Sequence, residues 1–127
     1  MSSETTGGEG GLEVEDVVRF ETAGDASSLV AHVHGEIDTL TAPLLRTELD
    51  ARISEAPLVV LDLSGVSFLG SAGLAVLVAA KDQVERAGHS LKLVCGSRIV
   101  TRALEATGLL GLFEVADGVP EALRPSA

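Results

Sequence analysis

Ser71 is the side chain whose setting in this sequence most suggests chemistry. It stands in the stretch GVSFLGSAG at residues 65–73, with Gly70 directly before it and Gly73 two residues after it, and the apolar run 74–80 follows directly. The start of a helix offers free N–H groups and the positive end of the helix dipole. A hydroxyl there can cap the helix, and the same place accepts a phosphate. Judged by these residues, Ser71 is a nucleophile, a phosphate acceptor or a helix cap.

A hydrolase role for Ser71 lacks its supporting residues. The nucleophile elbow of esterases has the pattern G-x-S-x-G, and neither Ser67 nor Ser71 has both glycines at that spacing. The histidines are His32, His34 and His89, and His89 lies in the turn just after the helix that Ser71 opens, not late in the chain. A P-loop requires a lysine where Ser71 stands. We therefore predict that the protein is not an enzyme and needs no cofactor.

The other chemically active side chains fit structural roles. His32 and His34 share one strand face, but two imidazoles are fewer than the three or four ligands of a zinc site, so we expect no metal. Asp62 ends a buried strand beside Ser64, where it would cap the following loop. Cys95 is the only cysteine and ends an apolar run, so we expect it in the core, and an intermolecular redox role stays open.

The charge of the chain limits the class of partner. The net charge is -10 and only 2% of the 127 residues are aromatic, which argues against nucleic acid because phosphates attract a basic surface and bases stack on rings. The same acidity opposes binding to anionic membranes, and no apolar run approaches the roughly 20 residues of a membrane span. The N-terminus lacks the features of a signal peptide. We expect a cytoplasmic protein with a protein partner or a small ligand.

Turn residues and apolar spacing predict the elements that position Ser71. Two strands over 13–21 and 28–37, joined by a turn at 24–28, would form a hairpin. The predicted elements after it are a helix that Thr41 begins by capping and Pro57 closes, a strand 58–63, a helix 71–87 ending at Gly88, a strand 91–95, a helix 98–106, a strand 112–115 and a short helix 119–123. This order predicts an α/β sheet with crossovers in one domain over residues 12–127, after a disordered tail over residues 1–11. Five apolar residues around the Ser71 loop are assigned to the core: Val66, Phe68, Leu74, Leu77 and Val78.

Two motifs match those of a known family. GEID at residues 35–38 fits a G-E-[LI]-D turn, and VVLDLSGVSFLGSAGLAVL at residues 59–77 fits D-L-S-x-V-x-F-[LM]-D-S-[SAT]-G-L. A late S-G-L-like turn is represented by residues 107–109. Over residues 12 to 123 the chain resembles the STAS-domain anti-sigma factor antagonists, or anti-anti-sigma factors. The resemblance implies a STAS-type mixed β-sheet with an N-terminal strand pair, then alternating helices and strands, with the helices packed largely on one face.

The resemblance also implies a function. The protein would bind an anti-sigma factor that is an ATP-dependent serine kinase and so free a sigma factor, until phosphorylation at the family position matched by Ser71 ends the binding. A phosphatase would restore it. The residues implied in partner binding lie in the turn and in the phosphoacceptor loop. They are Gly35, Glu36, Ile37, Asp38, Thr39, Ser67, Leu69, Gly70, Ser71, Ala72 and Gly73.

One position departs from the family pattern. Gly70 stands where the family has aspartate, so the local charge and the recognition by a kinase differ there. An alternative function is a STAS subunit of a sensor complex or of a lipid-transport system without phosphorylation switching. The neighbouring genes would distinguish the two functions. A gene for an anti-sigma kinase favours the anti-sigma factor antagonist, and a transporter operon favours the alternative.

Overall fold

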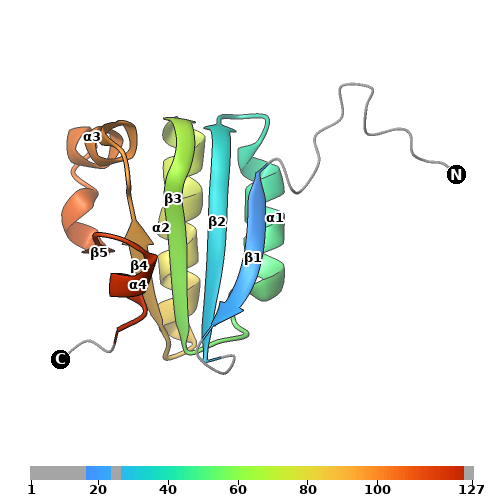
Figure 1. The fold of residues 1–127 in the computed structure, drawn as a ribbon. Coiled ribbons are helices and arrows are strands. Elements are labelled where there is room, and N and C mark those ends of the chain that lie inside the picture. The colour runs from blue at the N-terminus through green and yellow to red at the C-terminus, as the bar shows by residue number, and fades with distance from the viewer. Residues whose placement is uncertain (1–16, 24–26, 125–127) are drawn as a thin grey trace, which may run out of the picture.

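A mixed sheet of five strands is the frame of the structure, a computed structural model that describes residues 17–23 and 27–124. The strands lie side by side in the order β1-β2-β3-β4-β5, with β1 antiparallel to β2 and all later neighbours parallel (Figure 1). Their bounds are β1 Val18–Ala23, β2 Ser28–Ile37, β3 Leu58–Leu69, β4 Ser90–Val94 and β5 Glu114–Ala116. The predicted strand pair followed by crossovers is confirmed.

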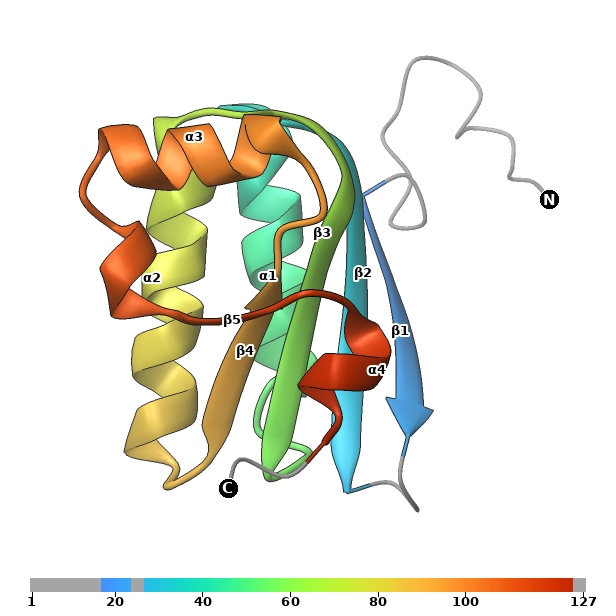
Figure 2. The same cartoon turned by 60° about the vertical axis from the view of Figure 1, so that its left-hand side comes forward.

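The helices lie mainly on one side of this sheet. Helices α1 and α2 cover one face, α3 crosses near the carboxyl ends of the strands, and the short α4 packs on the opposite face (Figure 2). The bounds are α1 Ala42–Arg52, α2 Ser71–Arg86, α3 Arg98–Ala106, the 3-10 helix η3 Leu110–Leu112 and α4 Val119–Ala122. Of the helices in the described part of the chain, none has the length and apolar character needed to cross a membrane.

Alternation along the strands divides the core between the two faces. In β2, Ala31 and Val33 pack with α1, α2 and α3, whereas Val30 points to the other face. There Val30, Val60 and Val94 make a small cluster under Ala122 of α4. The larger core is built almost wholly from Val, Leu, Ile and Ala side chains, as expected for a chain with three phenylalanines and no other aromatic residue.

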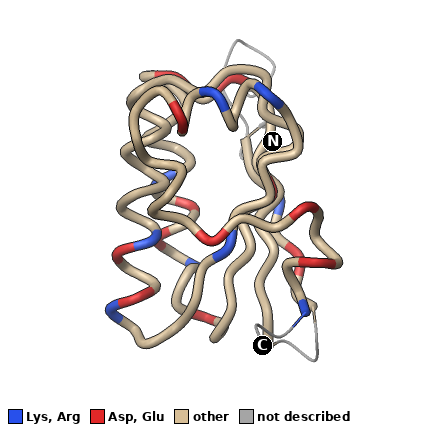
Figure 3. Tube along the Cα trace, turned by 90° about the vertical axis from the view of Figure 1, so that its left-hand side faces the viewer, with Lys and Arg blue, Asp and Glu red and all other residues tan. Residues whose placement is uncertain are grey.

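Helix α2 begins in the core and ends in solvent, as its sequence predicts. Its first turns bury Leu74 and Leu77, and its last turns carry exposed ion pairs of i,i+4 spacing, Lys81 with Glu85 at 2.8 Å and Asp82 with Arg86 at 3.1 Å. Charges of both signs alternate there along the helix (Figure 3). The residue after its C-cap, Gly88, has φ of 79°, a left-handed turn that glycine adopts readily.

The bounds predicted for the third and the last strand are wrong. Strand β3 continues to Leu69, six residues beyond the predicted end at Leu63, because it stays paired with β2 through register shifts at 32–34 and 35–36. Serine and glycine at 64–65 suggested an end, but the bulged partner strand accommodates them. The predicted strand 112–115 is displaced to 114–116, since residues 110–112 form a 3-10 turn.

Some predicted features fall on residues that the structure does not describe. They are the tail over residues 1–11, the first four residues of the strand predicted at 13–21, and residues 24–26 of the predicted turn. The described part of that strand, β1, runs two residues further than predicted, to Ala23.

A buried lysine fixes α4 to the sheet. Lys92 of β4 is only 6% exposed, and its Nζ donates to the carbonyl oxygens of Ala122 and Arg124, each at 3.1 Å. The Glu114 carboxylate lies 3.6 Å from the same Nζ. The ammonium group thus satisfies carbonyls at the end of α4 that have no partner within the helix.

We expect Lys92→Met to lower the free energy of unfolding by about 1–3 kcal/mol, because the methionine keeps the apolar stem and leaves two carbonyls without their donor. Lys81→Met is the matched control, since the Lys81 ammonium pairs only with exposed Glu85, and its effect should stay within about 0.5 kcal/mol. Urea unfolding measures both. Equal effects in the two variants would contradict the anchoring role of Lys92.

Candidate functional site

The loops after β2 and β3 lie side by side at the carboxyl ends of the parallel strands. The pairing of β2 with β3 continues to their last residues, where Ile37 faces Leu69. Beyond the strands, Gly70 N donates to Ile37 O at 3.0 Å. This bond joins the GEID turn to the loop that carries Ser71, so residues far apart in the sequence form one surface (Figure 1).

The GEID turn is held by the Asp38 carboxylate. Its Oδ1 accepts hydrogen bonds from the backbone N–H groups of Leu40 and Thr41, both at 3.0 Å. The Thr41 hydroxyl accepts from Asp38 N at 2.9 Å and donates to Glu36 O at 2.7 Å. Thr41 therefore occupies the N-cap position of α1 without capping the helix through its side chain, which corrects the predicted capping role.

The structure of the GEID turn accounts for the glycine at position 35 and for a low pKa of Asp38. Gly35 has φ of 85°, in the left-handed region that favours glycine, at the β-bulge before the turn. The hydrogen bonds from Thr41 and Leu40 hold the pKa of Asp38 below its ordinary value of 3.8, because they stabilise the charged carboxylate. Asp38 thus shapes the loop, and Thr39 beside it is exposed.

Ser71 is exposed at the first residue of α2. The N-cap is Gly70, in an extended conformation with φ of -90° and ψ of -179°, and the helix has no side-chain cap. The prediction that Ser71 caps the helix is therefore wrong. Within the described residues its hydroxyl has no hydrogen-bond partner, and it stands at the positive end of the helix dipole.

Three residues predicted to touch a partner are instead buried. Ile37 is 0% exposed, Leu69 is 7% exposed, and Gly73 lies beneath the loop surface. A Cβ added at Gly73 would lie 2.7 Å from Ile37 Cγ2 and 2.7 Å from Leu69 Cδ1, so α2 approaches β2 as closely as a glycine permits. These residues form the floor of the site. The surface belongs to the exposed members of the predicted set, Glu36, Thr39, Ser67 and Ser71, and to the partly exposed Gly35, Asp38, Gly70 and Ala72.

Two residues assigned to the core are on the surface. Phe68 is 50% exposed because β3 continues to Leu69, and alternation turns Leu69 inward and Phe68 outward. Val78 is 38% exposed because it lies off the buried stripe of α2. Leu40, two residues after the GEID motif, was not predicted as a surface residue and is 76% exposed. A leucine in a polar turn just before a helix start was the available signal. The assignments of Val66, Leu74 and Leu77 to the core are confirmed.

Polar side chains on β1, β2 and β3 bind one another and join the strands. His32 bridges two carboxylates across three strands, with Nδ1 2.8 Å from Asp62 Oδ2 and Nε2 2.7 Å from Glu21 Oε1. Asp62 Oδ1 also accepts from the backbone N–H and the hydroxyl of Ser64, at 3.1 and 2.7 Å. Because β3 continues through both residues to Leu69, these bonds lie within a strand, and the predicted loop-capping role is wrong. The register of three strands brings this network together, and the sequence spacing did not reveal it.

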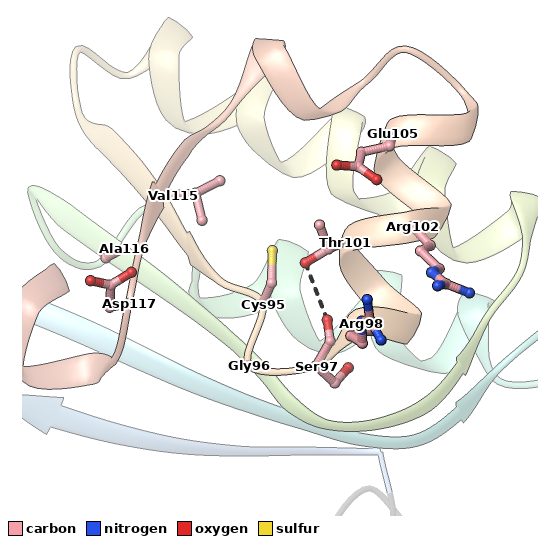
Figure 4. A pocket seen from close by; sticks show the side chains of 10 residues that line it. All are labelled: Cys95, Gly96, Ser97, Arg98, Thr101, Arg102, Glu105, Val115, Ala116 and Asp117. Carbon is pink, nitrogen blue, oxygen red and sulfur yellow. Dashed lines mark hydrogen bonds between the residues drawn. The ribbon is translucent and has the colours of Figure 1, made fainter.

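A cavity of about 530 Å³ lies between α3 and β5, and none of its lining residues belongs to the two loops (Figure 4). Its rim mixes charges, with Arg98 and Arg102 near Glu105 and Asp117. The Cys95 thiol at its wall is 5% exposed, which confirms the predicted burial, and desolvation raises the pKa of the thiol. A buried thiol with a raised pKa is a poor nucleophile. The surface around Ser71 remains the better candidate.

The chain matches the profile of the STAS domain over residues 18–122. It belongs to the STAS domain family. Anti-sigma-F factor antagonist RsfB of Mycobacterium tuberculosis is 30% identical over 115 residues, which are 88% of this chain and 92% of RsfB. The STAS fold predicted from the two motifs is thereby confirmed, together with the resemblance to anti-sigma factor antagonists.

Solved STAS structures agree with this assignment. An anti-sigma factor antagonist from Mycobacterium paratuberculosis superposes with a TM-score of 0.74 at 31% identity, covering 88% of this chain and 96% of that one. The phosphorylated form of the Bacillus cell fate determinant SpoIIAA has a TM-score of 0.61 at 17% identity, over 79% of this chain and 91% of its own. The second likeness concerns the fold alone.

The Asp38 carboxylate should make the stability of this STAS domain depend on acid. Because folding lowers its pKa, the carboxylate stabilises the fold above the ordinary value of 3.8, and this contribution is lost as the pH falls through the lower folded pKa. The stability deficit of Asp38→Asn should therefore shrink as the pH falls below 3.8. NMR titration of the Asp38 carboxyl carbon gives the folded pKa directly, and a midpoint at or above 3.8 would refute the proposed hydrogen bonding.

Gly73→Ala should lower the free energy of unfolding by about 1–3 kcal/mol, since the added methyl group must displace Ile37 or Leu69. Gly111→Ala is the control, because no other atom lies within 4 Å of a Cβ at that position, and we expect a change within about 0.5 kcal/mol. Chemical denaturation compares the two. A neutral Gly73→Ala would mean that the floor of the site is not tightly packed.

Proposed function

We propose that this protein is an anti-sigma factor antagonist whose partner is an anti-sigma factor of the ATP-dependent serine kinase type. Binding would sequester that partner and free a sigma factor, and phosphorylation of Ser71 would end the binding until a phosphatase removes the phosphate. The observation that carries the proposal is the exposed Ser71 hydroxyl, which has no hydrogen-bond partner within the described residues, at the positive end of α2. The protein would act in the cytoplasm, without nucleic acid, membrane or cofactor.

The position of Ser71 suits a kinase substrate. Its hydroxyl oxygen would attack the γ-phosphorus of ATP, the bond to the β-phosphate oxygen would break, and the hydroxyl proton would pass to a base on the partner. The hydroxyl needs no rearrangement of the helix cap for this step, because Gly70 and not Ser71 holds the cap position. The phosphate then lies at a helix N-terminus, which stabilises negative charge in the free protein.

The same phosphate opposes the complex. It adds about -1.5 to -2 charges at a point that the partner covers closely, beside the acidic Glu36 and Asp38 of the neighbouring loop. Like charge and lost hydration in a close interface cost several kcal/mol, and each 1.4 kcal/mol is a factor of ten in affinity. The free protein tolerates the phosphate and the complex does not, which makes Ser71 a switch. The names of the relatives support this function, since RsfB is an anti-sigma-F factor antagonist and SpoIIAA has a phosphorylated form.

The test is to mix the purified protein with candidate kinase-type anti-sigma factors, with and without ATP. We expect a complex without ATP, and one phosphate located on Ser71 by mass spectrometry when ATP is present. Ser71→Ala should abolish the modification, whereas Ser67→Ala, which removes the other exposed serine of the loop, should leave it intact. Phosphate on another residue, or no binding to any such partner, would overturn the proposal.

Charge at position 71 should control affinity. We expect Ser71→Asp to raise the dissociation constant at least tenfold by adding one negative charge to the interface, and Ser71→Ala to change it by less than about threefold. Calorimetric titration against the same anti-sigma factor without ATP measures both. Wild-type affinity in Ser71→Asp would show that charge at this residue does not govern binding.

A further inference from the structure

We propose that Phe68 and Leu40 form an apolar contact surface at the two joined loops, and that the anti-sigma factor places an apolar patch against it. Gly70 contributes by making room for the Phe68 ring. This inference rests on the proposed function and adds the chemistry by which the partner is recognised. It assigns to Gly70, the residue that departs from the family pattern, a role other than loss of charge.

The two side chains are exposed to a degree that the fold does not require. Leu40 is 76% exposed and Phe68 is 50% exposed, on the two loops that the hydrogen bond from Gly70 N to Ile37 O holds together. Phe68 belongs to the strand end that pairs with β2, opposite Glu36. Large apolar side chains grouped at one edge of a protein are typical of an interaction site, because covering them removes apolar area from water.

The Phe68 ring lies over Gly70. A Cβ at Gly70 would lie 3.0 Å from Phe68 Cε2 and 3.3 Å from Cζ, so the ring packs directly over the glycine. The backbone of Gly70, with φ of -90°, suits any residue, and backbone conformation does not explain the glycine. An aspartate there would press on the ring and place a carboxylate beside Ser71. The family pattern has phenylalanine at the position of Phe68 as well as aspartate at that of Gly70, so the glycine here removes a charge and lets the ring lie over the backbone.

The apolar surface continues past Ser71 between α1 and α2. A groove of about 360 Å³ is lined there by Ala42, Pro43, Ala75 and Val76, and by Ala72, the residue after Ser71. Thr39, the residue before Leu40, also lines the groove, and the one charged lining residue, Arg46, is paired with Asp50 at 3.0 Å. The apolar residues thus extend from Leu40 through the groove to the Ser71 loop.

The occupant we infer is the anti-sigma factor and not a second copy of this chain. The kinase must reach the Ser71 hydroxyl, so its surface covers the residues next to Ser71, among them Phe68 over Gly70. A second copy would bring together two chains of net charge -10, whose repulsion opposes association. The patch on the partner should accordingly be apolar opposite Phe68, where a partner of an aspartate-bearing relative would have reason to carry a basic group.

The experiment is a binding titration without ATP. It uses one kinase-type anti-sigma factor that binds the wild-type protein, and it compares four variants. Each variant is first shown to unfold cooperatively on heating. We expect Phe68→Ser and Leu40→Ser each to raise the dissociation constant at least tenfold. Leu112→Ser, the control, removes an apolar side chain that is 52% exposed outside the two loops and should stay within about twofold of wild type. Gly70→Ala, which displaces the ring without adding charge, should raise the constant about threefold or more.

The outcomes separate this inference from the proposed function. If the Ser71→Asp protein loses binding while Phe68→Ser and Leu40→Ser bind as tightly as wild type, the apolar surface is refuted and the charge switch stands. If no kinase-type anti-sigma factor binds the wild-type protein, the proposed function itself fails. If sedimentation shows a wild-type dimer that Phe68→Ser dissociates while its binding to the anti-sigma factor is unchanged, the surface belongs to a second copy and the inference is wrong.

Discussion

The close approach of α2 to the end of β2 is the constraint on which the site depends. Gly73 lies against Ile37 and Leu69 at a distance that excludes any larger residue without movement, and one turn earlier Gly70 N donates to Ile37 O. These contacts fix where α2 begins. They bring the GEID turn and the Ser71 loop to one surface, and they direct the free N–H groups of the first turn of α2 towards solvent beside the Ser71 hydroxyl.

The same constraint leaves the Ser71 hydroxyl exposed at the start of α2. The side-chain oxygen of a serine at the N-cap would accept a hydrogen bond from a backbone N–H. Ser71 is one residue further along, and its oxygen has no partner in the described part of the chain. The Asp38 carboxylate is occupied by backbone donors of its own turn, so it stabilises the loop without competing for that hydroxyl. Local chemistry and packing thus leave the Ser71 hydroxyl available at the exposed start of α2.

Much of the fold could be predicted from the sequence because local signals agree with the global structure. Apolar runs, Gly88 and the Pro57 break located the strands and helices, and the two motifs located Ser71 at a helix start. The errors around the end of β3 have one cause, which is that sequence spacing does not give side-chain direction near a bulge. The register shifts in β2 lengthen β3, turn Phe68 outward and bury Ile37 and Leu69, and none of these follows from the motif. The contacts of His32 with Asp62 and Glu21 likewise require the register of three strands.

The central claim is that one phosphate at Ser71 separates two binding states of the same folded chain. The direct measurement is the dissociation constant of a single preparation for its anti-sigma factor, taken after enzymatic phosphorylation and again after a phosphatase has removed the phosphate. The account predicts weak binding in the first state and tight binding in the second, differing by at least a factor of ten, with the same thermal unfolding profile. Equal affinity in the two states would contradict it.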